Sequence, residues 1–508
     1  MSDQAVGSRV PSGSVRYRSA AGRFILLATV LGSALVALDA TVVNIALPEI
    51  GESLSADLAG LQWILNAYTL VQAGLLLLGG ALGDRYGHRR VFALGLFAFA
   101  GASALCSAAP TAALLIAARA LQGVGAALLT PTSLAIIEAT FHPDDRSAAI
   151  GAWSGLGAVV IASGPLVGGY LTAALTWRLI FLINLPFAAV AVWATLRHVP
   201  GGRDAQAAPR LDYPGAALSA LGLCGTIYAL TAAPAAGWRS PWVVASALGG
   251  LGALLGFVIV ERASRQPLVP LGLFRSREFS GANAVTFVIY GGLGGTLFLL
   301  PIELQRVVGL SVLGSAFALM PMTVLMLILS PSAGRLAFRA GPRLPMVVGP
   351  LLAAAGLAML GRVTPGSSYV ATTFPALVVL GLGLSTTVAP LTATVLGAAG
   401  PAHPGVASAI NTAVARAAGS IAVATLPLAA GIAGRAALAP EVFAAGFGRA
   451  MWIAATLALL GSALSFLTIG SRAVLPGAGG ERRLGAPPLS CPVAGPPCAV
   501  LDESPRPG

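Results

Sequence analysis

An aspartate inside an apolar segment is the residue of this chain best suited to chemistry. Asp39 lies in a long apolar run that begins near residue 24. It is about 15 residues into that run, or roughly 23 Å along a helix. A carboxylate surrounded by apolar material is costly when ionised, so it can exchange a proton as its surroundings change. Two roles fit Asp39: carrying a proton, or making a packing hydrogen bond to a neighbouring helix.

An arginine in another apolar run supplies the opposite charge. Arg119 lies about eight residues into its run, at a depth similar to that of Asp39 if the two helices are antiparallel. The two side chains can therefore pair. Gln122 follows one helical turn later, and Gly123 and Gly125 allow close helix approach. Because arginine almost never loses its proton, we assign the proton to Asp39 and an electrostatic role to Arg119. A purely structural arginine is the alternative.

The apolar runs that position these residues must be membrane-spanning helices. The chain has 508 residues, is 56% hydrophobic and 9% charged, and has a mean hydropathy of +0.85. A soluble core does not absorb that much apolar sequence, whereas a helix of about 20 apolar residues crosses a bilayer. The sequence predicts fourteen spans, at 24–46, 61–82, 91–109, 111–134, 147–173, 178–196, 213–232, 242–260, 281–301, 312–334, 344–361, 368–396, 404–430 and 449–470.

The distribution of arginine indicates the orientation. All 30 basic residues are arginine, which is typical of a GC-rich bacterial genome. With the amino terminus in the cytoplasm, most of them fall in cytoplasmic loops or tails, as the positive-inside rule requires. The net charge of +12 therefore indicates a membrane protein and no nucleic-acid partner. We expect a bacterial plasma-membrane protein with both termini in the cytoplasm.

A charged turn joins the second and third spans. It concentrates four charged residues and one histidine between residues 83 and 90. Asp84, near the end of the second span, can accept hydrogen bonds from an arginine or a helix amino terminus and so act as a conformational latch. A topological anchor is the alternative, and it suits the arginines better. The candidate latch residues are Gly83, Asp84, Arg85, Gly87, Arg89 and Arg90.

Glycines recur along the fifth span at near-helical spacing. Together with one proline they predict close, kinked packing against another helix, and by themselves they say nothing of transport direction. The residues are Gly151, Gly155, Gly157, Gly164, Pro165, Gly168 and Gly169.

An internal repeat indicates two halves. The stretch Gly125–Pro131, followed by His142-Pro143, returns as Gly383–Pro390 and His403-Pro404. In transporters, such repeats place a substrate cavity between the halves near the bilayer midplane. We predict an amino-terminal tail (1–23), a six-helix half (24–196), an inserted helix pair (213–260), a second six-helix half (281–470) and a disordered cytoplasmic tail (471–508).

Polar residues within the spans are candidates for the cavity lining. They are Asn44, Asn66, Tyr68, Gln72, Gln122, Tyr290, Asn411 and Arg416, and each can equally serve ordinary packing. Arg416 adds a second positive charge where we identify one deep acid, which disfavours a substrate with two cationic groups. Uncharged, zwitterionic and anionic substrates stay open, and a monovalent cation can still use Asp39.

The sequence does not indicate an enzyme or a metal site. The four histidines (His88, His142, His198 and His403) fall singly in loops. Of the cysteines, Cys106 and Cys224 lie within or beside spans, and Cys491 and Cys498 lie in the tail. We expect no cofactor, and a proton gradient as the energy source.

Several motifs resemble those of a known family. Gly79–Arg90 resembles the loop signature of the major facilitator superfamily, while Leu38–Pro48 and Trp177–Pro186 resemble its fourteen-helix drug:proton antiporter branch. Arg119–Gly125 is similar to that family's fourth-helix motif, and Gly164–Gly169 to the motif associated with exporters. The resemblance implies that Asp84 stabilises an outward-open state, that Arg119 modulates proton transfer, and that transport is outward.

We therefore expect an all-α membrane protein with the major facilitator superfamily fold, built of two six-helix halves and two inserted helices. Its expected function is proton-coupled antiport that exports hydrophobic or amphipathic drugs or antibiotics, as in multidrug efflux. The alternatives are a dedicated exporter of an endogenous metabolite or antibiotic, an uptake symporter, and a non-transporting sensor or scaffold. The expected partners are a small-molecule substrate, protons and lipid, and the expected state is a monomer.

Overall fold

The computed structural model describes residues 15–201, 212–264, 267, 269–400, 404–432 and 439–471. The predicted tail at 471–508, apart from its first residue, lies outside the described residues. So do His403, Cys491, Cys498 and most of the predicted tail at 1–23.

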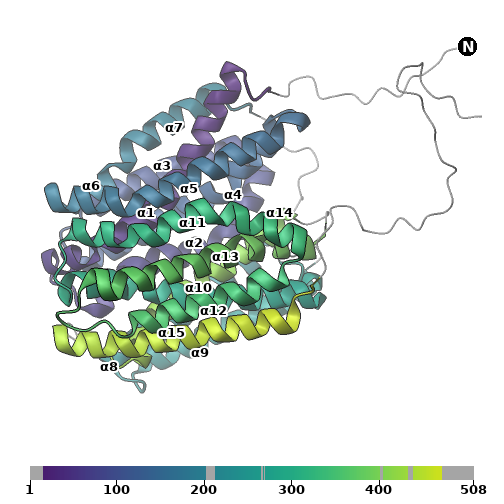
Figure 1. The fold of residues 1–508 in the computed structure, drawn as a ribbon. Helices are drawn as coiled ribbons and strands as arrows, with labels where there is room; N and C mark the ends of the chain where they lie inside the picture. The colour runs from purple at the N-terminus through teal and green to yellow at the C-terminus, as the bar shows by residue number, and fades with distance from the viewer. Residues whose placement is uncertain are drawn as a thin grey trace, which may run out of the picture. The chain divides into compact units, whose positions relative to one another are not determined.

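The described residues are almost entirely helical, and the long helices run side by side (Figure 1). The elements are α1 (Ala20–Ser53), α2 (Leu58–Tyr86), α3 (His88–Ala108), α4 (Ala112–Thr140), α5 (Pro143–Ala174), α6 (Leu179–Leu182), α7 (Asn184–His198), α8 (Tyr213–Ala236), α9 (Pro241–Ala263), the 3₁₀ turn η1 (Leu271–Arg275), α10 (Arg277–Arg306), α11 (Val312–Ala340), α12 (Arg343–Leu360), the π-helical turn η2 (Tyr369–Thr373), α13 (Phe374–Ala398), α14 (Pro404–Ala429) and α15 (Pro440–Thr468).

The expected all-α fold of fourteen spans is confirmed. Within the described residues, 14 helical segments are long and apolar enough to cross a membrane, with α6 and α7 together forming the sixth. Several helices extend beyond the predicted limits, because their polar ends continue past the apolar run. For example, α1 begins at Ala20, where the hydroxyl of Ser19 accepts a hydrogen bond from the amide of Gly22 at 3.0 Å.

The same packing pattern occurs twice along the chain. In the first six spans, α1 packs on α5 and α7, α2 on α4, and α3 on α4 and α7. In the last six spans, α10 packs on α14 and α15, α11 on α13, and α12 on α13 and α15. Between these two sets, α8 and α9 pack on each other, and α8 also contacts α2 and α14. We call the two sets the first and second halves.

Hydrogen bonds join the two halves at one end of the bundle. We call the end at which α1 begins and α2 turns into α3 the basic end, after its arginine-rich turn, and the other the opposite end. At the opposite end, the Gln305 side chain donates to the carbonyl of Ile45 (3.0 Å), and Arg306 pairs with Glu52 (3.0 Å). The Gln62 side chain also donates to the carbonyl of Val423 (2.8 Å).

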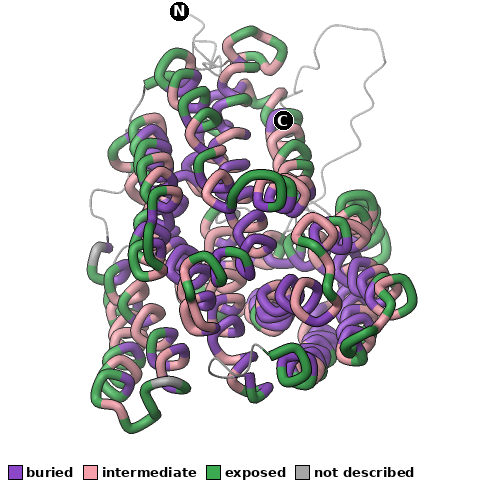
Figure 2. The backbone as a smooth tube through the Cα atoms, turned by 90° about the vertical axis from the view of Figure 1, so that its left-hand side faces the viewer, coloured by how far each residue is buried: buried purple, intermediate pink, exposed green. Residues whose placement is uncertain are grey.

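The outer faces of the helices are apolar, and the inner faces are buried (Figure 2). Leu94, Trp242 and Leu248 are more than 60% exposed, whereas Phe92 and Phe298 are fully buried. Large exposed apolar side chains over so much of the surface are what a protein solvated by lipid presents.

Glycine allows the close approach of α2 to α4, and this generates a prediction. A Cβ added at Gly79 would overlap the carbonyl oxygen of Ala127, whereas one at Gly101 on α3 would meet nothing within 4 Å. We expect Gly79→Ala to lower the free energy of unfolding by about 1–3 kcal/mol through overpacking. Gly101→Ala should leave it unchanged or raise it. Size-exclusion chromatography after heating compares the two variants, and equal stability would contradict the packing described for Gly79.

Candidate functional site

A buried ion pair lies in the first half. Asp39 is near the middle of α1 and Arg119 is in α4, and their side chains form a salt bridge and a hydrogen bond. Asp39 is 1% exposed and Arg119 fully buried. The structure thus brings together the two residues that the sequence analysis placed at a similar depth.

Three polar residues extend this pair into a network. The Gln122 amide donates to Asp39 (2.8 Å) and to the hydroxyl of Ser103 (2.9 Å), while its oxygen accepts from Arg119 (2.7 Å). The Asn184 amide, at the start of α7, lies 3.5 Å from Asp39 and 3.3 Å from Ser103. We call these five residues the coupling network. The sequence analysis did not predict the places of Ser103 and Asn184, although a lone asparagine inside an apolar span is a signal that could have been used.

The second helix fixes the guanidinium of Arg119 from the other side. Its Nε donates to the carbonyl of Ile64 at 3.1 Å, and its central carbon lies 4.2 Å from the centre of the Tyr68 ring. The Tyr68 hydroxyl in turn donates to the carbonyl of Val36 at 3.2 Å. The arginine is therefore held by α1, α2 and α4 together. Its Nη2 atom is buried and makes no hydrogen bond with the described residues.

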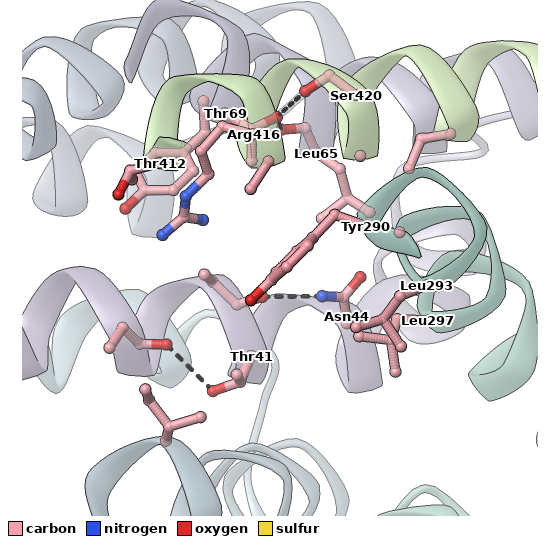
Figure 3. A pocket seen from close by; sticks show the side chains of 18 of the residues that line it. Thr41, Asn44, Leu65, Thr69, Tyr290, Leu293, Leu297, Thr412, Arg416 and Ser420 are labelled. Atoms are coloured by element: carbon pink, nitrogen blue, oxygen red, sulfur yellow. Dashed lines mark hydrogen bonds between the residues drawn. The ribbon is translucent and has the colours of Figure 1, made fainter. Parts of the chain in front are cut away.

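A cavity of about 520 Å³ lies between the two halves. This volume is in the range of small-molecule sites. Its walls come from α1, α2, α4 and α5 of the first half and from α10, α13 and α14 of the second (Figure 3). Of the predicted cavity residues, the structure places six in the lining: Asn44, Asn66, Tyr68, Tyr290, Asn411 and Arg416.

Two predicted cavity residues do not line it. Gln72 is buried against α4, where its amide donates to the hydroxyl of Thr130 at 3.3 Å, and Gln122 belongs to the coupling network. Both side chains point toward the interior of the first half. The rotation of each helix about its own axis turns them away from the cavity. Arg119 does line the cavity, although it was not predicted to, whereas Asp39 is not among the lining residues.

The cavity extends toward the basic end. Thr392 and Leu396 near the end of α13, and Ser408 near the start of α14, line it. These positions are at the basic end, whereas the bonds from Gln305, Arg306 and Gln62 close the opposite end. Midway, the hydroxyls of Thr69 and Ser420 join the halves at 2.7 Å. The hydrogen bonds between the two halves therefore lie at the opposite end and midway along the bundle, whereas the cavity reaches toward the basic end.

The charged turn is as tight as predicted. Only Gly87 separates α2 from α3. Its φ is +92°, a backbone conformation that would be strained for a residue with a side chain. Asp84 is 60% exposed and lies 3.5 Å from His88, and Arg89 donates to the carbonyl of Leu196 at 2.6 Å. Gly83 is buried beside Thr132 and His88, Arg85 lies against the ring of Tyr86, and Arg90 is exposed.

The glycine face of α5 packs closely along only part of its length. A Cβ at Gly164 would overlap Thr41, one at Gly168 would lie 2.8 Å from Val42, and one at Gly169 would lie 2.7 Å from Ala316 of α11. Pro165 is inside the helix at this contact. The expected close packing is wrong for Gly151, Gly155 and Gly157, where a Cβ would meet nothing within 4 Å. These three lie nearer the basic end of the bundle than Gly164, Gly168 and Gly169 do.

A second buried acid corrects the expectation that Asp39 is the one deep carboxylate. Glu303 was placed just beyond the ninth span, but α10 continues to Arg306 and the side chain of Glu303 is fully buried. Its two oxygens accept no hydrogen bond from the described residues. The predicted span ends at Pro301 because the apolar run ends there. In the structure α10 continues, and packing against neighbouring helices buries Glu303.

The described histidines have local contacts. His142 caps α5, with its Nδ1 3.4 Å from the amide of Asp144, and His198 stacks on Phe24 at 4.3 Å. Within the described ranges, no three His, Cys, Asp or Glu residues are grouped closely enough to hold a metal ion.

Within the described residues, 14 membrane-length helices form two similarly packed six-span halves and an additional pair, α8 and α9, and the halves share a cavity. This architecture defines a membrane transporter. The model of the Major Facilitator Superfamily matches residues 29–424. The chain is 35% identical over 401 residues to the tetracenomycin C resistance and export protein of Streptomyces glaucescens, covering 79% of this chain and 74% of that protein. It is 38% identical over 410 residues to a puromycin resistance protein of Streptomyces alboniger, covering 80% of each. The chain belongs to the Major Facilitator Superfamily.

Solved structures agree on the fold. A bacterial homologue of the human lysosomal transporter Spinster, in an inward-facing and unoccupied conformation, superposes with a TM-score of 0.64 at 18% identity, covering 89% of this chain and 97% of that one. A D-xylose–proton symporter gives 0.61 at 16% identity, covering 88% and 98%. At these identities the likeness shows the fold alone.

The buried ion pair generates a prediction about stability. Asp39→Asn and Arg119→Gln each leave one charge buried without its partner, so each should lower the free energy of unfolding by about 3–5 kcal/mol. The double variant removes both charges and should lose less than the sum of the two single changes. The stabilities of the unaltered protein, the two single variants and the double variant, compared by their thermal unfolding midpoints, give the coupling between Asp39 and Arg119. Strictly additive losses of stability would mean that the pair is not coupled.

Glu303 generates a second prediction. Glu303→Gln removes a buried ionisable group that has no partner among the described residues while keeping its shape. It should therefore raise the stability by about 1 kcal/mol or more. The control is Glu49→Gln on an exposed position of α1, which should change little. A loss of stability in Glu303→Gln, measured by the same heating assay, would show that the carboxylate has a stabilising role.

Proposed function

We propose that this protein exports hydrophobic or amphipathic antibiotics or drugs across a bacterial plasma membrane in exchange for protons. The relatives named for resistance to, or export of, tetracenomycin C and puromycin support the cargo class and the direction. The observation that carries the coupling is the buried Asp39–Arg119 pair beside the cavity.

The proposed orientation places the basic end in the cytoplasm, as the arginine-rich turn between α2 and α3 favours. The cavity then reaches toward the cytoplasm and the opposite end is closed, which is an inward-facing state. In this state a substrate enters from the cytoplasm or the inner leaflet. Outward opening requires the bonds from Gln305, Arg306 and Gln62 to break and the basic ends of the halves to approach.

In the proposed coupling, Arg119 links the proton to the substrate. Ionised Asp39 holds Arg119 against α1, and protonation of Asp39 removes that ion pair. The freed guanidinium, which already lines the cavity, then moves into space that a substrate needs. A bound substrate conversely keeps Arg119 on Asp39 and favours loss of the proton. Proton and substrate therefore occupy the transporter in turn, which is antiport.

The available driving force is sufficient for this cycle. A difference of one pH unit is worth about 1.4 kcal/mol per proton, and a membrane potential of 100 mV contributes about 2.3 kcal/mol per charge. One proton moving inward can thus sustain a concentration ratio of several hundredfold for an uncharged substrate.

Two other functions share this fold. A dedicated exporter of one antibiotic or metabolite is the nearer alternative, and the relatives named for single antibiotics favour it. An uptake symporter is the more distant one, since the D-xylose–proton symporter has the same fold. Export and uptake differ in the direction in which the substrate crosses the membrane, which a flux measurement reports.

The test is substrate-induced proton release from everted membrane vesicles energised to an acidic interior. Tetracenomycin C, puromycin and methylenomycin A, compounds named for its relatives, form the panel. We expect at least one compound to release protons with the unaltered protein and not with Asp39→Asn. Glu49→Gln should behave as the unaltered protein. Because Asp39→Asn is expected to be less stable, the Asp39→Asn/Arg119→Gln double variant is tested beside it, at matched amounts of folded protein.

Two outcomes would contradict the proposal. Undiminished proton release in both Asp39 variants would place the coupling elsewhere. Proton uptake with substrate, measured in the same vesicles, would indicate symport.

A further inference from the structure

Arg416 is the charged group of the cavity that the coupling mechanism does not use. It projects from α14 into the cavity, toward α1 (Figure 3). It makes no ion pair or hydrogen bond within the part of the chain that the structure describes. Arg119, by contrast, is matched by Asp39.

The charge of the cavity wall follows from these two arginines. Among the described lining residues, Arg119 and Arg416 carry charge, and no aspartate or glutamate is present. The Asp39–Arg119 pair is neutral overall, so Arg416 gives the cavity a net positive charge. A guanidinium without a partner in a largely apolar cavity is costly, and an anionic ligand that pairs with it removes that cost.

The surroundings of Arg416 describe the rest of the ligand. Thr412 and Ser420 lie one helical turn to either side of Arg416 on α14 and also line the cavity. They form a polar stripe with Arg416 at its centre. The rest of the wall has apolar side chains, among them Leu65, Leu293, Leu297, Val395 and Leu396, together with uncharged polar ones such as Asn44, Tyr290 and Asn411. One charged strip, with apolar side chains and uncharged polar groups around it, fits a molecule with one acidic end and a mainly apolar body.

We propose that Arg416 is the substrate-recognition residue and that the preferred substrate is an amphipathic organic acid, whose carboxylate, phenolate or enolate pairs with the guanidinium. Planar oxygen pairs match the fork of arginine donors. The inference rests on the proposed function only in taking this cavity as the substrate site. When the acidic end of the substrate is bound to Arg416 of the second half, its apolar body extends across the cavity toward Arg119 of the first half.

The charge of the substrate has a consequence for energetics. Export of a monoanion together with inward movement of one proton transfers two positive charges inward per cycle. A neutral substrate transfers one, and a monocation none. An inside-negative potential therefore drives export of the proposed substrate most strongly.

Binding of a matched set of probes tests the proposal. The purified full chain in lipid nanodiscs is titrated at pH 7.5 with 1-pyrenebutyric acid, its primary amide and 4-(1-pyrenyl)butylamine, so that an anion, a neutral molecule and a cation share one apolar body. The variants are Arg416→Gln, the charge-conserving Arg416→Lys, and the control Arg239→Gln, at an exposed arginine outside the cavity. Pyrene fluorescence reports saturable binding, and size-exclusion chromatography reports folding.

We expect the acid to bind about tenfold or more tighter than the amide, and the amine to bind most weakly. Arg416→Gln should abolish the preference for the acid, Arg416→Lys should retain part of it, and Arg239→Gln should retain all of it. Absence of saturable acid binding, tighter binding of the amine, or an unchanged preference in folded Arg416→Gln would each overturn the proposal. Binding requires neither gradient nor turnover, so failure of proton coupling in the vesicle assay leaves this result standing, and the reverse also holds.

Discussion

The neutralisation of one buried aspartate by one buried arginine is the interaction on which the rest of this structure depends. Asp39 and Arg119 are enclosed in the first half, where an unpaired charge would be severely destabilising. Gln122 and Asn184 donate further hydrogen bonds to Asp39, and Ser103 accepts from both of their amides. Because these five residues come from α1, α3, α4 and α7, the network also fixes how those helices pack. A change in the protonation of Asp39 therefore affects both the cavity wall and the helices behind it.

The separation of contacts and cavity along the bundle is the second constraint. The halves bond to each other at the opposite end through Gln305, Arg306 and Gln62, while the cavity reaches toward the basic end. The small-residue contacts of α5 obey the same division, since Gly164, Gly168 and Gly169 are tightly packed and Gly155 is not. A transporter held together at one end can rock without unpacking either half, and the repeated packing of the two halves is what makes such a motion geometrically simple.

The sequence predicted what depends on the chain alone. The lengths of the apolar runs predicted the fourteen spans, and Gly87 predicted the tight turn. The similar depth of Asp39 and Arg119 in two antiparallel spans predicted that they can pair. Rotation of helices about their axes was not predictable, because the hydropathy pattern does not distinguish the faces of a helix when all of them are apolar. This is why Gln72 was assigned to the cavity and Arg119 was not. Glu303 was missed because its burial comes from neighbouring helices and not from its own segment.

The central claim is that substrate binding expels the proton of Asp39, and the most direct measurement is proton release on binding. The purified protein in weakly buffered lipid nanodiscs is mixed with a compound that it binds, and a pH indicator records the protons released per molecule bound. The account predicts release from the unaltered protein and binding without release from the Asp39→Asn/Arg119→Gln variant. Equal release from both proteins would contradict it, since the proton would then come from a different group.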